Sequence, residues 1–450
     1  MEPALIKHLK QDFGDYLQEL VSLVQKPSIS ATGEGIGPCA HFLAERMRSY
    51  GIESTLHELP DGHPVIVGKV GGRRKDKTLL IYNHYDVQPP EPLDKWESDP
   101  FSGRVAEGRI LGRGSADSKG NLMAYLSAIR MLSETGGLPI SLKLLFEGEE
   151  EIGSPHLARF IDSHVPELRA DAVVSCDGEM DPSGRPMISL GMKGLIYVEL
   201  RCRKLNRDVH SSRAPLLPSA SWRLVKALNE LTDAEGRISI PGWRQGILGP
   251  SDLDLKLLKG TPFDEERVKK EFGVSELLHG KAGLEALRDL LYEPTCNIAG
   301  LTAGYQGAGT KTVLPAEARA KMDLRLVYDQ NADRCLELLK RHLNARGFAD
   351  IEVEVLGKID PSHTPADAPI ARAAVNAARA VYGQEPVIYP KHYASGPDYL
   401  FTRNLGFHSV WTGCAPEGGR MHAPNEFIGV DDYRLGILYA CELINRFGAM

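Results

Sequence analysis

The chain has 450 residues, of which 42% are hydrophobic and 25% charged, and its formal net charge is −7. This length exceeds the size at which a single hydrophobic core stops growing, so we expect two domains in a protein of ordinary soluble composition. The negative charge and the lack of a basic cluster argue against nucleic-acid binding and favour a small-molecule partner.

The first helix is predicted at residues 4–24, where apolar positions recur at helical spacing and end before Pro27. A second helix is expected at 37–50. Apolar strands and helices then alternate, with strands at 65–70, 78–82, 141–146 and 172–175 and a helix at 120–133. This alternation predicts an α/β domain in which helices cover a mixed, largely parallel sheet.

The pattern changes near residue 193. Residues 195–202 and 318–326 alternate apolar with polar side chains, as half-exposed strands do. Helices at 220–231 and 332–346 and a strand at 351–356 complete this pattern, whereas residues 233–300 give no clear signal. We therefore expect an α+β domain at 193–360, inserted into a first domain formed by residues 1–192 and 361–450. The latter segment contributes helices at 369–382 and 430–447 and a strand at 408–412.

The N-terminal segment and the cysteines predict a cytoplasmic protein. Residues 1–8 carry charge and proline where a signal peptide needs a basic region followed by an apolar one. No apolar run approaches the ~18 residues of a membrane span. The seven cysteines are odd in number, scattered and never spaced as C-x-x-C, so we expect reduced thiols.

Four glutamates directly follow the predicted strand at 141–146, namely Glu147, Glu149, Glu150 and Glu151. Like charges crowded at the end of a buried strand repel one another and lose hydration, so a compensating cation such as a divalent metal would explain them. A solvated acidic loop that opens a helix explains the segment equally well, because the helix dipole favours glutamate there.

Other strand ends carry similar side chains. His84 and Asp86 follow the strand at 78–82, at the edge where open α/β sheets bind ligands. Being two residues apart, they point to the same side, so Asp86 can hold the ring of His84 from behind. A polar turn is the alternative interpretation of this pair.

Three further segments add oxygen or nitrogen donors. Residues 112–120, GRGSADSKG, match neither common phosphate-loop pattern, and Asp117 in such a turn can offer both oxygens to two metal ions. Asp177 follows the strand at 172–175, and His422 lies in a loop before the last helix. Chance explains one such placement far more easily than five. Nitrogen and oxygen donors without thiolate suit zinc, manganese or cobalt.

Taken together, these segments resemble the M20 family of metallopeptidases, and most closely its dipeptidase branch of cytosolic non-specific dipeptidases and carnosinases. The resemblance spans almost the whole chain and is carried by HYDVQP at 84–89, GSADSKGN at 114–121, FEGEEEIGS at 146–154, Asp177 and MHAPNE at 421–426.

The resemblance implies two divalent metal ions, zinc ahead of manganese or cobalt. One ion would be bound by His84 and Asp177, the other by Glu151 and His422, and Asp117 would bridge both. Glu150 would be the general base, Asp86 would orient His84, and the peptide bond after Asp117 would be cis.

The inserted domain resembles the lid and dimerisation domain of the same family. His210 matches a lid histidine that reaches the site of the partner subunit, although SSRAP at 211–215 departs from the expected glycine-rich continuation. Arg325 matches an arginine that holds the substrate carboxylate, and Ser395 and Gly396 would line the same pocket. From the residues alone, His210 is also compatible with a surface loop and Arg325 with an outward charge on an alternating strand.

These observations predict a cytoplasmic homodimeric enzyme that cleaves dipeptides or short peptides and binds neither nucleic acid nor membrane. Metal-activated water would attack the peptide bond, with Glu150 moving the proton and His210 stabilising the oxyanion. The alternative is a deacylase that releases an amino acid from an N-acyl conjugate at the same site. A non-catalytic metal-binding protein is a third hypothesis, which the presence of Glu150 opposes.

Overall fold

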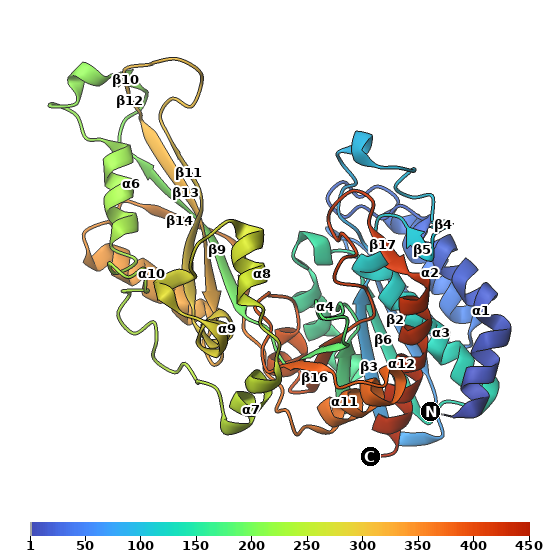
Figure 1. Cartoon of the computed structure of the whole chain (residues 1–450). Helices are drawn as coiled ribbons and strands as arrows, with labels where there is room; N and C mark the ends of the chain where they lie inside the picture. The colour runs from blue at the N-terminus through green and yellow to red at the C-terminus, as the bar shows by residue number, and fades with distance from the viewer. Residues whose placement is uncertain (1) are drawn as a thin grey trace.

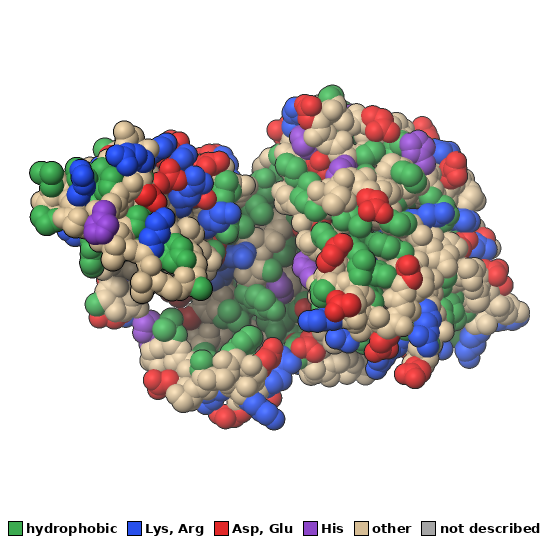
Figure 2. Space-filling view, turned by 90° about the horizontal axis from the view of Figure 1, so that it is seen from above, with side chains coloured by type: hydrophobic (Ala, Val, Ile, Leu, Met, Phe, Trp, Pro, Cys, Tyr) green, Lys and Arg blue, Asp and Glu red, His purple; other side chains and the backbone are tan. Residues whose placement is uncertain are grey.

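The computed structural model describes residues 2–450 as two bodies, each built on its own sheet (Figure 1). Both ends of the described range lie in the larger body. Its eight strands are β1 (Glu53–His57), β2 (Val65–Val70), β3 (Arg74–His84), β6 (Ile140–Glu147), β7 (Ala172–Ser175), β8 (Met187–Ser189), β15 (Val387–Tyr389) and β16 (His408–Thr412). Seen from above, an open hollow separates the two bodies (Figure 2).

The larger sheet is mixed, with the strand order β1-β2-β6-β3-β7-β16-β8-β15. Its centre is parallel, because β3 pairs in parallel with both β6 and β7, and β7 with β16. The flanking pairs β1–β2, β2–β6 and β16–β8 are antiparallel. This topology confirms the fold class expected from the sequence and places the carboxyl ends of the central strands at one edge.

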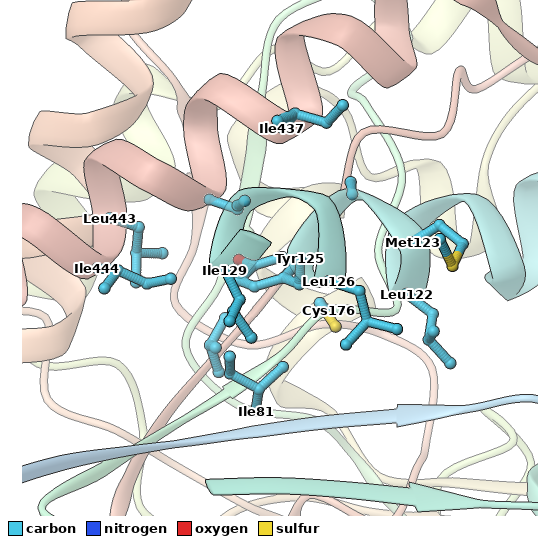
Figure 3. Close-up of a cluster of buried hydrophobic side chains, with 14 of the residues drawn as sticks. Ile81, Leu122, Met123, Tyr125, Leu126, Ile129, Cys176, Ile437, Leu443 and Ile444 are labelled. Atoms are coloured by element: carbon cyan, nitrogen blue, oxygen red, sulfur yellow. The ribbon is translucent and has the colours of Figure 1, made fainter. Parts of the chain in front are cut away.

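Helices cover both faces of this sheet because successive strand residues point to opposite sides. Ile81 of β3 packs in a core with α3 (Gly120–Thr135) and α12 (Val430–Gly448), as Figure 3 shows. The same core includes side chains of α1 (Pro3–Val24), α2 (Ile36–Ser49) and α11 (Pro369–Tyr382). Leu80 and Tyr82 instead pack on the other face with α4 (Leu157–Ser163) and α5 (Val165–Leu168).

The smaller body has a four-stranded antiparallel sheet of order β11-β13-β9-β14. Its strands are β9 (Gly194–Arg203), β11 (Thr295–Ala303), β13 (Glu317–Leu326) and β14 (Glu352–Ile359). One face is buried against α6 (Ala220–Asn229) and α10 (Ala332–Ala345). A two-stranded ribbon, β10 (Val209–His210) with β12 (Val313–Leu314), forms the far tip of this body (Figure 1).

Residues 233–300, which gave no clear pattern, contain α7 (Asp252–Gly260), α8 (Glu265–Phe272) and α9 (Gly283–Tyr292). Leu258 of α7 and Leu291 of α9 pack against Met187 of β8 and Tyr389 of β15, at the edge of the larger sheet. The sheets thus change near residues 193 and 360, while α7 and α9 pack against the larger sheet. The domain division at those residues remains a prediction.

Three short strands, β4 (Arg104–Ala106), β5 (Arg109–Leu111) and β17 (Phe427–Gly429), form a small separate sheet that joins the segment before Asp117 to the segment after His422. Within residues 2–450, no helix combines the length and apolar character needed to cross a membrane.

Candidate metal centre

The carboxyl ends of β3, β6 and β7 bring together side chains that are far apart in the sequence. His84 is the last residue of β3, and Glu150 and Glu151 lie in a short helical turn just after β6. Asp177 follows β7 by two residues. Because these strands are parallel neighbours, their ends meet at one edge of the sheet.

The first group of potential metal ligands consists of His84, Asp117 and Asp177, whose donor atoms all lie within 4.8 Å of one another. His84 is completely buried, and its Nε2 lies 3.1 Å from Oδ1 of Asp117 and 3.2 Å from Oδ1 of Asp177.

The second group consists of Asp117, Glu151 and His422. Nε2 of His422 lies 2.9 Å from Oδ2 of Asp117 and 3.1 Å from Oε2 of Glu151. Asp117 belongs to both groups and turns a different oxygen to each histidine. The structure therefore brings together all five residues that the sequence suggested as metal ligands.

Asp86 contacts both the histidine and the glutamate turn. Its Oδ1 lies 3.4 Å from Nδ1 of His84, and its main-chain carbonyl lies 3.1 Å from the same nitrogen. The Asp86 carboxylate also accepts hydrogen bonds from the backbone N–H groups of Glu150, at 3.2 Å, and Glu151, at 3.0 Å. Replacing Asp86 would therefore disturb the positions of both elements.

Glu426 fixes the turn that carries Asp117, a contact that the sequence reasoning missed. Its fully buried carboxylate accepts hydrogen bonds from the backbone N–H groups of Gly114, Ala116 and Asp117 at 2.9–3.0 Å. It also accepts one from the Arg113 guanidinium at 2.7 Å. The feature of the sequence that could have identified Glu426 is its position in the segment MHAPNE, four residues after His422. The peptide bond between Asp117 and Ser118 is cis, as expected.

The four glutamates after β6 divide into two pairs. Glu147 accepts hydrogen bonds from Tyr82 at 2.6 Å and Ser154 at 2.8 Å, and burial raises its pKa to about 8. Glu149 accepts a hydrogen bond from the backbone N–H of His63 and lies 2.9 Å from Nδ1 of His156. Both side chains are thus held by neutral or histidine partners, whereas Glu151 belongs to the second ligand group and Glu150 lies beside both groups.

The electrostatics of the centre fit a divalent cation. Burial raises the pKa of Glu150 well above its usual range, and the negative charges of Asp177 and Glu151 raise it further. Burial opposes a charged His84, yet Asp177 and Asp117 raise its pKa well above the usual value. Hydrogen bonds that the His422 ring donates to Asp117 and Glu151 raise the pKa of His422 to about 10. The carboxylates therefore attract positive charge strongly, and a bound divalent metal can replace these histidine protons.

The three residues of the predicted carboxylate pocket, Arg325, Ser395 and Gly396, lie close together. Arg325, at the end of β13, donates a hydrogen bond of 2.7 Å to Oγ of Ser395. A side chain at Gly396 would lie only 3.1 Å from Sδ of Met192 and 3.3 Å from the ring of Trp411, so this wall is close-packed. Trp411 in turn donates a hydrogen bond of 2.6 Å to the main-chain oxygen of Asp177. This bond connects the Arg325 pocket to the first ligand group.

Lys193 was also missed by the sequence reasoning, which had no pattern to distinguish it from a surface lysine. It lies beside Arg325 and donates a hydrogen bond of 2.6 Å to the carbonyl of Glu293. Burial, together with the positive charge of Arg325, lowers its pKa to about 8. A cation in this position adds to the positive potential of the pocket.

His210 does not join the centre within one chain. It is exposed at the tip of the smaller body, where Nε2 lies 3.1 Å from Oγ1 of Thr312 and Nδ1 lies 2.8 Å from Oγ of Ser212. The tip points away from the larger body in Figure 1.

Comparison with known proteins places this geometry in a family. The sequence profile of peptidase family M20/M25/M40 matches residues 80–446. An M20 family metallo-carboxypeptidase from Sulfolobus solfataricus has 39% sequence identity and a TM-score of 0.92, and the match covers 97% of this chain and 99% of that one.

Two curated relatives match at lower identity. The Cys-Gly metallodipeptidase of Schizosaccharomyces pombe is 26% identical over 99% of this chain and 98% of its own length. The human Beta-Ala-His dipeptidase is 28% identical over 85% of this chain and 81% of its own length. The family profile covers well over half of the chain, and the solved carboxypeptidase matches it almost end to end. The chain therefore belongs to peptidase family M20/M25/M40 and is an enzyme of the metallopeptidase class.

Proposed function

We propose that the protein is a di-metal exopeptidase that hydrolyses the peptide bond of dipeptides or short peptides. The observation that carries this proposal is the pair of histidine–carboxylate groups that share Asp117, with Glu150 beside both. The relatives, two dipeptidases and a carboxypeptidase, support the same reaction class.

Five residues would hold the two ions, which we expect to be zinc, with manganese or cobalt as alternatives. His84 and Asp177 would bind one ion, Glu151 and His422 the other, and Asp117 would bridge them. The oxygen and nitrogen donors fit such ions, and with Glu150 the four carboxylates balance the charge of two divalent cations. Two adjacent divalent ions activate a shared water and polarise the carbonyl of the substrate.

Glu150 would act as the general base. Among the described residues, no hydrogen bond engages its carboxylate, in contrast to those of Glu147 and Glu149. A carboxylate without a fixed partner is free to take the proton of the attacking water and return it to the leaving amine. The backbone contacts from Asp86 hold the turn so that Glu150 and Glu151 keep separate tasks.

Arg325, Ser395 and Gly396 would bind a carboxylate of the substrate, with Lys193 adding positive charge. An arginine already paired with a neutral hydroxyl gains a charge-assisted bond when a carboxylate arrives. This pocket would favour peptides whose free C-terminal carboxylate lies close to the scissile bond.

The hydrogen-bond donor that stabilises the oxyanion would come from His210 of a second subunit. We therefore propose a homodimer that forms through the smaller body. Trp222 of α6 is 68% exposed and Val225 is 42% exposed, an apolar surface of the type that subunit contacts bury. Location in the cytoplasm remains a prediction.

A substrate comparison tests the proposal. Unblocked dipeptides and N-acetyl or N-succinyl amino acids would be compared with zinc, manganese or cobalt supplied. We expect turnover of the dipeptides, whereas exclusive turnover of the acylated set would identify a deacylase instead. Glu150→Gln should bind metal and lose ~10²-fold or more in rate, as expected for a missing general base. Absence of hydrolysis of both substrate sets by the wild type with each metal would refute the proposed reaction.

A further inference from the structure

A second set of metal-ligand side chains lies outside the candidate metal centre, between β1 and α5. It consists of His57 at the end of β1, His164 between α4 and α5, and Glu167 in α5. One donor atom from each residue lies within 4.8 Å of the others, the same limit that holds for the two groups of the candidate centre. The set shares no residue with that centre.

The two imidazoles are oriented for ligation. Nδ1 of His164 lies 2.9 Å from the carbonyl oxygen of Phe160. The imidazole of His164 also stacks on the phenyl ring of Phe160, with ring centroids 4.1 Å apart. A ring that donates its Nδ1 proton to a carbonyl keeps a free lone pair on Nε2, which is the usual arrangement of a metal-binding histidine. The ring of His57 meets that of His164 edge-on at 4.8 Å.

His57 also presents an unsatisfied atom. Its Nε2 is buried and has no hydrogen-bond partner among the described residues. Because buried polar atoms in proteins are nearly always paired, such an atom calls for a ligand, and a metal ion would satisfy it.

The carboxylate of Glu167 is held in place by Lys69, whose Nζ lies 2.6 Å from its Oε1. Ligating carboxylates are commonly anchored by such a hydrogen bond. Two imidazoles and one carboxylate form a known zinc donor set that leaves a fourth position open. Donors bound to zinc at ~2.0–2.1 Å lie about 3.4 Å apart, so the three side chains would close inward by roughly 1 Å.

An adjoining cavity gives access to the fourth position. It has a volume of about 430 Å³ and is lined by residues that include His57 and His164. The cavity therefore provides room for water or an exchangeable ligand beside the two histidines.

We propose that His57, His164 and Glu167 bind one zinc ion that ties the edge strand β1 to the segment joining α4 and α5. A strand at a sheet edge has a neighbour on one side only, so an ion at its last residue would restrain its end. Zinc binding at this site does not depend on the reaction proposed above.

Metal counting tests this site. The full chain would be freed of metal, reloaded with zinc and dialysed, and zinc per chain would be measured by mass spectrometry. We expect His164→Ala and Glu167→Gln each to bind one zinc fewer than the wild type and to keep peptidase activity, because neither residue belongs to the candidate centre. His41→Ala, which removes an exposed histidine of α2, is the matched control and should bind as much zinc as the wild type.

Thermal unfolding gives a second readout. Zinc should raise the Tm of the wild type by more than it raises the Tm of either variant, because an ion that binds only the folded state stabilises it. Glu167→Gln preserves side-chain volume, so it keeps the test valid if His164→Ala folds poorly. Equal zinc content in the wild type and a folded Glu167→Gln variant would overturn the proposal.

Discussion

Glu426 offers a test of how the turn that carries Asp117 is held, through the substitution Glu426→Gln. The carboxylate accepts four hydrogen bonds, three from consecutive or nearby backbone N–H groups and one from Arg113. Glutamine keeps one acceptor oxygen but replaces the other with an NH₂ group, which would face these donors. It also leaves the Arg113 guanidinium without its counter-charge.

The expected loss follows from burial. The side chains of Arg113 and Glu426 are 1% and 0% exposed, and removing one partner of a buried ion pair destabilises a protein by about 3–5 kcal/mol. This is a large part of the roughly 5–15 kcal/mol that holds a typical domain folded. Because the turn positions Asp117, metal affinity should fall as well, by roughly 10–100-fold.

Urea unfolding and competition with a metal-binding dye would measure the two effects. Glu385→Gln is the matched control, since Glu385 pairs with Arg379 at the surface, where the side chains are 66% and 49% exposed. An exposed pair contributes at most about 1 kcal/mol, so this control should lose little stability and no metal affinity. If Glu426→Gln behaves like Glu385→Gln in both assays, the assigned role of Glu426 is wrong.

Three further predictions concern the dimer, the pocket and pH. Inactive His210→Ala and inactive Glu150→Gln would be mixed under conditions in which subunits are shown to exchange. Half of the dimers should then be mixed and each should have one competent site, so roughly a quarter of the wild-type activity should return. No recovery would exclude action across subunits. Arg325→Met should raise KM for dipeptides more than it lowers kcat, and an unchanged KM in initial-rate assays would remove Arg325 from substrate binding. Burial lowers the pKa of His392 to about 4, so the unfolded chain takes up a proton between pH 6.5 and 4 that the folded chain does not. His392 should therefore contribute a fall of about 3 kcal/mol to the free energy of unfolding over that range, and urea unfolding at pH 7 and pH 4.5 should show a smaller fall in His392→Gln.

The sequence predicted the five metal-ligand candidates because their signal is local. Each of His84, Glu151 and Asp177 follows an apolar strand, and the parallel pairing of those strands brings their ends together. The main helices were also predicted to within a few residues, since their buried faces recur at helical spacing. In this part of the chain, the local apolar pattern of the sequence and the long-range pairing of the strands indicate the same arrangement.

Other features depend on contacts that no local pattern reveals. β11 was missed because it is an edge strand with a register shift between Ile298 and Gly300, so its apolar positions do not alternate. α7 and α9 each carry four leucines but were missed because they are short, with 9 and 10 residues, and their buried side chains find partners only on β8 and β15. Lys193 and Glu426 look like ordinary charged residues until the fold places them beside Arg325 and Arg113.

The acidic segment 147–151 shows why neighbouring glutamates can have different tasks. Tyr82 and Ser154 hold Glu147, and the backbone of His63 together with the ring of His156 holds Glu149. With these two side chains fixed and the next two N–H groups bound by Asp86, the turn has little freedom left. Glu150 and Glu151 are therefore directed to the metal-binding edge, one as a free carboxylate and one within reach of His422. An acidic loop in water would have none of these restraints, so the contacts favour a metal site over the solvated loop that the sequence left open.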